Sequence, residues 1–204
     1  MINCVWHTNT IVKEELSKLP AESYSGRIVV IQSIPEAKKA VKCLRDSNVV
    51  GFDTETKPAR RKGEVNNISL IQISSNEICF LFRTINPKIL PFPLEILEDD
   101  GILKIGLSLR DDFGRLRAMT DFTPRNFIEL QTYVKDYGII DNGLSRIYAD
   151  VFGRRISKRQ RLSNWEADFL TNEQKKYAAL DAWATLRIYN ELENFKKTNC
   201  NKDN

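Results

Sequence analysis

The sequence predicts an α/β or α+β domain in which a mixed β-sheet is flanked by α-helices. Short runs of β-branched and aromatic residues alternate with capped helical segments, which is the order expected of such a domain. The length of 204 residues fits one domain with a small extension, and 42% hydrophobic residues are enough for a sizeable core. We therefore expect a polar N-terminal arm at 1–26, a domain at 27–196 and a polar tail at 197–204.

The first half of the domain is predicted to run as strand, helix, strand and hairpin. A β-branched run predicts a strand at 28–31, and a Ser-x-x-Glu capping box opens a helix at 33–45. Valine and phenylalanine predict a strand at 49–55. After a charged loop that contains proline and glycine, the segments 68–73 and 78–82 are predicted to form a hairpin around a Ser-Asn turn.

The second half adds one strand and several helices. A helix at 87–99 is interrupted by two prolines, and a strand follows at 103–107. The serine that opens the next segment is expected to cap a helix at 108–119. Two glycines bound a helix at 143–153, and a Thr-x-x-Gln capping box opens a long helix at 171–195.

Low counts of several residue types exclude whole classes of site. The single histidine, His7, is too few for an HExxH zinc site, and four cysteines without CxxC spacing indicate reduced thiols in an intracellular protein, cytoplasmic by default. No glycine-rich nucleotide loop occurs, so no small-molecule cofactor is expected. No uncharged run exceeds the twelve residues 65–76, so we expect no membrane span. Any catalysis must therefore rest on carboxylates, tyrosines, lysines or a metal held by oxygen.

The strand at 49–55 carries two carboxylates at its end. Asp53 and Glu55 are two residues apart, so they share one face of the strand. Two like charges so close raise the free energy of the folded chain unless a cation lies between them. The alternative is a pair of solvated acids on an edge strand.

The helix at 108–119 carries two adjacent aspartates with different surroundings. Its apolar stripe is formed by Leu109, Phe113 and Leu116, and Asp112 falls within that stripe. Asp111 falls outside the stripe, where we expect a pairing with the arginine four residues on. A carboxylate on a face that packs against the core needs a partner, so Asp112 is the candidate site residue. We expect Phe113 to pack in the core rather than stack on a terminal base.

The long helix at 171–195 places a tyrosine beside an aspartate. Tyr177 and Asp181 are four residues apart, so they stack on one helix face, and that face continues through Ala184 and Ile188. The alternative to a functional pair is a tyrosine hydroxyl bonded to a buried aspartate.

Together the three segments supply four carboxylates and one tyrosine. Ligand sets made only of oxygen select hard cations such as Mg²⁺ or Mn²⁺, and four carboxylates suit a pair of ions. Two such ions stabilise the attacking and the leaving oxygen in phosphodiester cleavage.

The motif set Asp53-x-Glu55, Asp112 and Tyr177-x-x-x-Asp181 resembles that of the DEDDy 3′→5′ exonucleases. The resemblance covers about residues 47–193 and is greatest to the Werner-syndrome-type exonuclease domain. It implies a ribonuclease H-like fold of the α/β class. It also implies that Asp53, Glu55 and Asp181 hold the metal that activates water, that Asp53 bridges to a second metal, that Asp112 acts on that second site through water, and that Tyr177 orients the attacking water.

Two basic segments flank these motifs and are candidate contacts to a phosphate backbone. The chain has 31 basic and 27 acidic residues, a net charge of +4 that favours polyanionic partners only mildly. The alternative for either segment is a solvated loop. The candidate nucleic-acid-binding residues are Lys57, Arg60, Arg61, Lys62, Arg154, Arg155, Lys158, Arg159 and Arg161.

The leading hypothesis from the sequence is a metal-dependent 3′→5′ exonuclease that releases nucleoside 5′-monophosphates, with DNA favoured as substrate. The alternatives are a ribonuclease D-like exoribonuclease and a non-catalytic nucleic-acid-binding module of the same fold. A purely structural domain is the remaining alternative, and the acidic residues make it the least favoured.

Overall fold

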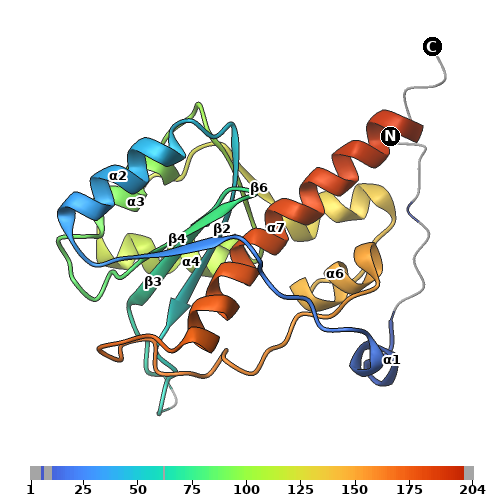
Figure 1. Ribbon diagram of the computed structural model, residues 1–204, viewed down its shortest axis with the longest axis horizontal. Helices are drawn as coiled ribbons and strands as arrows, with labels where there is room; N and C mark the ends of the chain where they lie inside the picture. The colour runs from blue at the N-terminus through green and yellow to red at the C-terminus, as the bar shows by residue number, and fades with distance from the viewer. Residues whose placement is uncertain (1–5, 7–10, 62, 200–204) are drawn as a thin grey trace.

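The fold is built on a six-stranded mixed sheet with helices on both faces (Figure 1). The computed structural model describes residues 6, 11–61 and 63–199. The strands lie in the order β1-β4-β3-β2-β5-β6. Central strand β2 pairs antiparallel with β3 and parallel with β5. The strands are β1 (Arg27–Ile31), β2 (Val49–Thr56), β3 (Ile68–Ser74), β4 (Ile78–Phe82), β5 (Leu103–Gly106) and β6 (Phe127–Glu129).

Two hydrophobic clusters cover the two faces of the sheet. One cluster packs beneath α2 (Ile34–Leu44), α3 (Pro91–Leu97) and α4 (Leu109–Met119). The other packs beneath α5 (Leu130–Tyr133), the 3₁₀ helix η1 (Val134–Tyr137), α6 (Leu144–Phe152) and α7 (Asn172–Asn199). Strand β3 is buried along its whole length because both of its faces are covered. These two layers of helices around one mixed sheet confirm the predicted fold class.

Both predicted capping boxes form. The Glu36 carboxylate accepts a hydrogen bond from the Ser33 backbone N–H at 3.0 Å at the start of α2. At the start of α7, the Thr171 N–H donates to Gln174 Oε1 at 2.9 Å and the Gln174 N–H donates to Thr171 Oγ1 at 3.1 Å. Helix α7 continues to Asn199, so the predicted tail is helical over 197–199, and residues 200–204 lie outside the described part of the chain.

Three predicted elements differ from the structure. Helix α3 begins at Pro91 rather than at residue 87, because proline lacks an N–H and fits the first helical turn. The segment 127–137, to which the sequence analysis assigns no element, forms β6, α5 and η1, each too short to show a periodicity. The helix cap predicted for Ser108 is also wrong: Glu129 accepts from the backbone N–H of Ser108 at 3.0 Å and of Leu109 at 2.8 Å.

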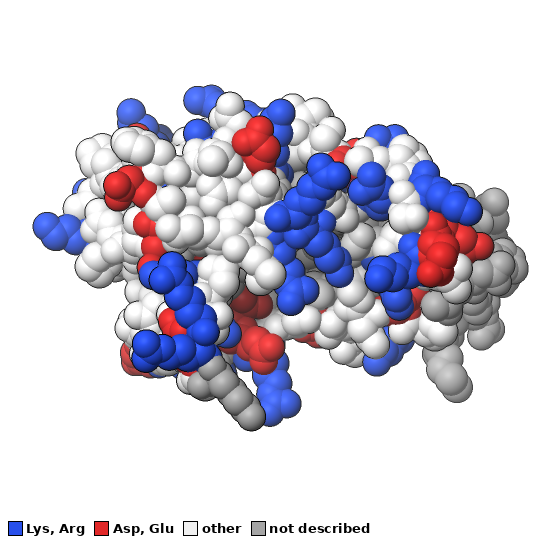
Figure 2. Space-filling model, turned by 90° about the horizontal axis from the view of Figure 1, so that it is seen from below, with Lys and Arg blue, Asp and Glu red and all other residues white. Residues whose placement is uncertain are grey.

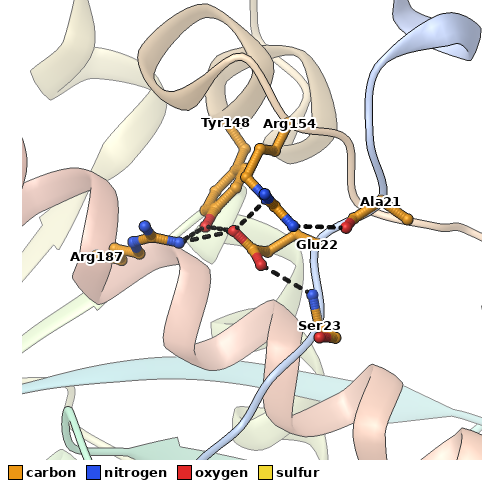
Figure 3. Close-up of polar contacts among 6 residues, drawn as sticks. All are labelled: Ala21, Glu22, Ser23, Tyr148, Arg154 and Arg187. Carbon is orange, nitrogen blue, oxygen red and sulfur yellow. Dashed lines mark hydrogen bonds and ion pairs between the residues drawn. The ribbon is translucent and has the colours of Figure 1, made fainter.

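The N-terminal arm contains helix α1 (Lys13–Lys18) and is fastened to the domain through Glu22 (Figure 3). The Glu22 carboxylate accepts hydrogen bonds from Tyr148 and Arg187, each at 2.8 Å, and Arg154 Nε lies 3.1 Å from it. Arg187 in turn lies over the aromatic rings of Tyr148, Phe152 and Trp183. The arm is therefore held by α6, α7 and the residues that follow α6.

Helix α7 runs across one face of the sheet and contacts β1 to β5 (Figure 1). It approaches β2 most closely at Gly51, where an added Cβ would overlap the Ala182 carbonyl oxygen and lie 3.0 Å from Thr185 Oγ1. Only glycine leaves room for that approach. No helix in residues 6, 11–61 and 63–199 is long and apolar enough to cross a membrane.

We predict that Gly51→Ala lowers the free energy of unfolding by about 1–3 kcal/mol, because the methyl group forces α7 away from β2. Urea denaturation measures the change. Gly114→Ala is the matched control: its Cβ meets open space within α4, so the same substitution should raise stability by about 0.5–1 kcal/mol. Equal effects at the two positions would contradict the close approach.

Candidate functional site

Three carboxylates from two elements meet at the end of β2. Asp53 and Glu55 project from one face of β2, and Asp181 comes from α7 where that helix crosses the strand. One oxygen of each carboxylate lies within 4.8 Å of the others. Glu55 and Asp181 are buried, each with 8% of its surface exposed. The three line a cavity of about 490 Å³, called the acid cavity below. Strand β2 is central in the sheet, so the alternative of two solvated acids on an edge strand is wrong.

Asp111 and Asp112 both line the acid cavity, and Asp112 is the fourth candidate site carboxylate. It is half-buried on α4 and accepts a hydrogen bond from the Thr54 hydroxyl of β2, whereas Asp111 is exposed. Phe113 packs against Phe122 and Phe127 in the core, as the helix stripe predicts. The structure thus turns Asp112 toward the two carboxylates of β2.

The expected pairing of Asp111 with Arg115 is wrong. Arg115 Nη1 donates to the Asn66 carbonyl oxygen at 2.9 Å, and the arginine charge offsets part of the rise that burial causes in the pKa of Asp112. Arg115 lies one helical turn from Asp112 and lines the acid cavity. Sequence reasoning missed it as a site residue, although the spacing of three residues was a usable signal. Thr54 was missed as well, because a threonine between two acidic residues carries no distinctive pattern.

Tyr177 lies beside Asp181 on the same face of α7. Its ring packs against the fully buried Trp165, with 6.1 Å between ring centroids. Burial raises the pKa of Asp181, and the neighbouring Tyr177 hydroxyl offsets part of that rise. Burial, followed by the charges of Asp181 and Glu55, raises the pKa of Tyr177 itself. The phenol therefore stays protonated at neutral pH and serves as a hydrogen-bond donor.

The pKa values of all four carboxyl groups are raised, and burial is the largest cause in each case. For Asp53, the charges of Asp181, Glu55 and Asp112 add to burial and hold the pKa well above its ordinary value. The pKa is about 9 for Glu55, about 7 for Asp181 and about 6 for Asp112. Four ionised acids in one cavity destabilise the folded chain unless positive charge enters the cavity.

The donor set fits a divalent cation. Oδ1 of Asp181 is buried and has no hydrogen-bond partner among the described residues, although it faces other acceptors. Buried carboxylate oxygens without donors are rarely retained unless a cation satisfies them. Every ligand atom in the cluster is an oxygen, the donor preferred by Mg²⁺ and Mn²⁺.

The second basic segment, residues 154–161, divides between two roles. Lys158 and Arg161 line the acid cavity, where the charge of Lys158 offsets part of the burial-driven rise in the pKa of Asp181 and that of Arg161 part of the rise in the pKa of Glu55. Arg154 and Arg155 instead contact the arm: Arg154 donates to the Ala21 carbonyl and Arg155 Nε to the Leu19 carbonyl, each at 3.0 Å.

The first basic segment lies on the other side of the acid cavity. Lys57 forms an ion pair with Glu166 at 2.8 Å and lines a smaller cavity that shares Glu55 and Arg161 with the acid cavity. Arg60 and Arg61 are exposed, and Lys62 lies outside the described residues, as does His7.

Comparison with known proteins places the chain in a family. The family described as 3′-5′ exonuclease matches residues 28–195. Over 161 residues the chain is 33% identical to the mouse bifunctional 3′-5′ exonuclease/ATP-dependent helicase WRN, an alignment that covers 76% of this chain and 12% of that protein. The chain therefore spans only a small part of the length of this relative.

Two solved structures share the fold. The Aedes aegypti Nibbler EXO domain aligns with a TM-score of 0.77 at 19% identity, covering 87% of this chain and 94% of that one. Escherichia coli RNase D aligns with a TM-score of 0.72 at 22% identity, covering 84% and 46%. These likenesses confirm the ribonuclease H-like fold. Because the family match covers residues 28–195, which is most of the chain and includes all four candidate carboxylates, this chain belongs to the 3′-5′ exonuclease family.

Proposed function

We propose that the chain is a metal-dependent 3′→5′ exonuclease that hydrolyses the terminal phosphodiester bond of a strand and releases nucleoside 5′-monophosphates. The observation that carries the proposal is the cluster of Asp53, Glu55 and Asp181 within 4.8 Å, with Asp181 Oδ1 left without a donor. Membership of the exonuclease family supports the same conclusion.

Asp53, Glu55 and Asp181 would hold one Mg²⁺ or Mn²⁺ ion. Asp53 and Asp112 would hold a second such ion. Bound divalent cations supply the positive charge that makes water nucleophilic and that offsets charge developing on the phosphoryl group. The carboxylates that hold them are fixed by rigid elements, since three lie on β2 and α7 and the Thr54 hydroxyl orients the fourth.

Tyr177 would orient the attacking water. Because its pKa is raised, the hydroxyl keeps its proton and donates a hydrogen bond rather than acting as a base. Water adds to the phosphorus of the last linkage and the bond from phosphorus to the upstream 3′ oxygen breaks. The 3′ oxygen takes up a proton and stays on the strand, and the terminal nucleotide leaves with a 5′-phosphate. Lys158 and Arg161 would contact the phosphates that flank this bond.

DNA is the proposed substrate, because the motifs resemble the Werner-type domain and the chain is 33% identical to the mouse WRN protein. RNA is the second candidate, because RNase D, described as an exoribonuclease, shares the fold. RNA carries a 2′ hydroxyl that DNA lacks. The relative cleavage rates on DNA and RNA strands of the same sequence therefore distinguish the two proposed substrates.

We predict that the chain shortens 5′-labelled strands from the 3′ end in Mg²⁺ or Mn²⁺ and not in EDTA. A gel assay with single-stranded DNA, 3′-recessed duplex DNA and single-stranded RNA measures the products and ranks the substrates. Asp53→Ala should lower the rate by at least about 10³-fold, since it removes the carboxylate shared by both proposed ions. Retained binding without any cleavage would instead favour the non-catalytic nucleic-acid-binding module.

Three further substitutions compare the two adjacent aspartates and test the tyrosine. Asp112→Asn should abolish cleavage and Asp111→Asn should leave it within about threefold, because only Asp112 is bonded to β2. Tyr177→Phe should reduce the rate about 10²-fold while Mn²⁺ binding, measured by calorimetry, is retained. An inactive Asp111→Asn variant beside an active Asp112→Asn variant would overturn the assignment on α4.

We predict that the metal-free protein loses stability as the pH rises. Its raised carboxyl pKa values mean that the folded chain binds more protons than the unfolded chain between about pH 4 and about pH 9. The free energy of unfolding in EDTA should therefore fall across this interval, by up to about 1.4 kcal/mol per pH unit for each unmatched proton. Urea denaturation at several pH values measures the slope.

Asp53→Asn should flatten this slope and raise the stability of the metal-free protein at neutral pH, since it removes one charge from the cluster. Added Mn²⁺ should raise the melting temperature of the original protein more than that of the variant. Parallel slopes for the two proteins would contradict the raised pKa values.

A further inference from the structure

A larger cavity of about 870 Å³ adjoins the acid cavity. The two share five lining residues, Asn142, Gly143, Ser145, Ile156 and Lys158. The far wall of the larger cavity is formed by α1 of the N-terminal arm, through Lys13, Leu16 and Ser17. We call it the arm cavity. Its volume lies within the range of about 300–1,000 Å³ found for sites that bind drug-sized groups.

The arm cavity has an excess of positive charge. Lys13, Lys158 and Arg159 line it, are exposed, and form no ion pair in the described part of the chain. The one acidic residue of the lining, Asp141, is neutralised by Arg146 at 3.2 Å. Figure 2 shows the molecule from below, with Lys and Arg side chains gathered across the middle of this face. Such a cavity attracts a polyanion and repels cationic ligands.

The lining also offers apolar surface. Ile140 has 69% of its surface exposed, and Leu16 and Ile156 lie at the same cavity. A nucleotide presents both kinds of surface, a charged phosphate and an apolar base face, so the lining matches its chemistry.

The arm is fixed in a position where α1 lines this cavity. The Glu22 N–H donates to the Arg155 carbonyl at 2.8 Å, and the Arg155 N–H donates to the Pro20 carbonyl at 3.0 Å. Ala21 and Arg155 form a parallel bridge, and the Glu22 carboxylate is held by Tyr148, Arg154 and Arg187 (Figure 3). The wall carrying Lys13 is therefore pre-ordered, which lowers the entropy cost of binding.

We propose that the arm cavity binds the nucleotides immediately upstream of the 3′ terminus of the same strand, with phosphates on Lys13 and Arg159 and bases against the apolar lining. This proposal rests on the proposed exonuclease function. A strand whose 3′ end enters the acid cavity passes Lys158, shared by both cavities, and continues along the arm. The arm is then part of the substrate-binding surface.

The test compares two lysines of one helix. Lys13 lines the cavity, whereas Lys18 is exposed and lies five residues on, about 140° around the axis of α1. Lys13→Glu and Lys18→Glu change the net charge equally. Affinity for 5′-labelled single-stranded DNA of about two and about ten nucleotides is measured by fluorescence anisotropy in EDTA, so that no cleavage occurs.

Lys13→Glu should weaken binding of the longer strand about tenfold and that of the dinucleotide less than twofold. The slope of log K against log salt for the longer strand should fall in magnitude by about 0.7, as expected for one lost phosphate contact. Arg159→Glu, on the opposite wall, should behave in the same way, and Lys18→Glu should change either affinity less than twofold. Circular dichroism verifies that each variant is folded.

Equal losses for Lys13→Glu and Lys18→Glu, or equal losses on short and long strands, would overturn the proposal. The cleavage assay in Mn²⁺ is run alongside on the unaltered protein. If the unaltered protein cleaves the strand but the variants bind it without these differences, the proposed role of the arm cavity is wrong and the proposed exonuclease function stands. A protein that neither binds nor cleaves overturns the exonuclease function as well.

Discussion

The contact between α7 and β2 at Gly51 is the constraint on which the site depends. Asp53 and Glu55 come from the strand, and Asp181 comes from the helix, so the carboxylates converge only if the two backbones approach closely. A side chain at position 51 would separate them by overlapping the Ala182 carbonyl. The Thr185 hydroxyl donates to the Ile105 carbonyl at 2.9 Å and ties the same turn of α7 to β5. Helix α7 is thus fixed against both β2 and β5 within one turn of Asp181.

That convergence opposes stability, because burial raises the pKa of Asp53, Glu55, Asp112 and Asp181, and the charges of the neighbouring carboxylates raise the pKa of Asp53 and Glu55 further. The repulsion is sustained by the rest of the fold, which packs a hydrophobic cluster on each face of the sheet around β2 and β3. The positive charges of Lys158 and Arg161 offset part of the repulsion between the carboxylates, although neither residue forms an ion pair with them in the described part of the chain. Unfavourable electrostatics within a well-packed scaffold is a common property of functional sites.

The sequence predicted that these carboxylates and the tyrosine come together, because their spacing within each element is local. Asp53 and Glu55 follow the strand period, Tyr177 and Asp181 follow the helix period, and the stripe of α4 separates Asp112 from Asp111. Spacing along the chain does not predict interactions between residues that are distant in the sequence. The cap of α4 comes from Glu129 on a neighbouring strand, and a basic run such as 154–161 does not reveal which of its members face the arm. The roles that the resemblance assigns to individual residues remain predictions.

The residues 154–161 connect the two halves of the proposed surface. Arg154 and Arg155 hold the arm, and a few residues later Lys158 and Arg161 face the carboxylates. Because one short segment makes both sets of contacts, the position of the arm and the positions of the cations at the acid cavity are set together. Glu22 holds the arm in this position, because its carboxylate joins the arm to α6, to α7 and to Arg154. The arm therefore packs against the domain, although its sequence predicts a separate polar extension.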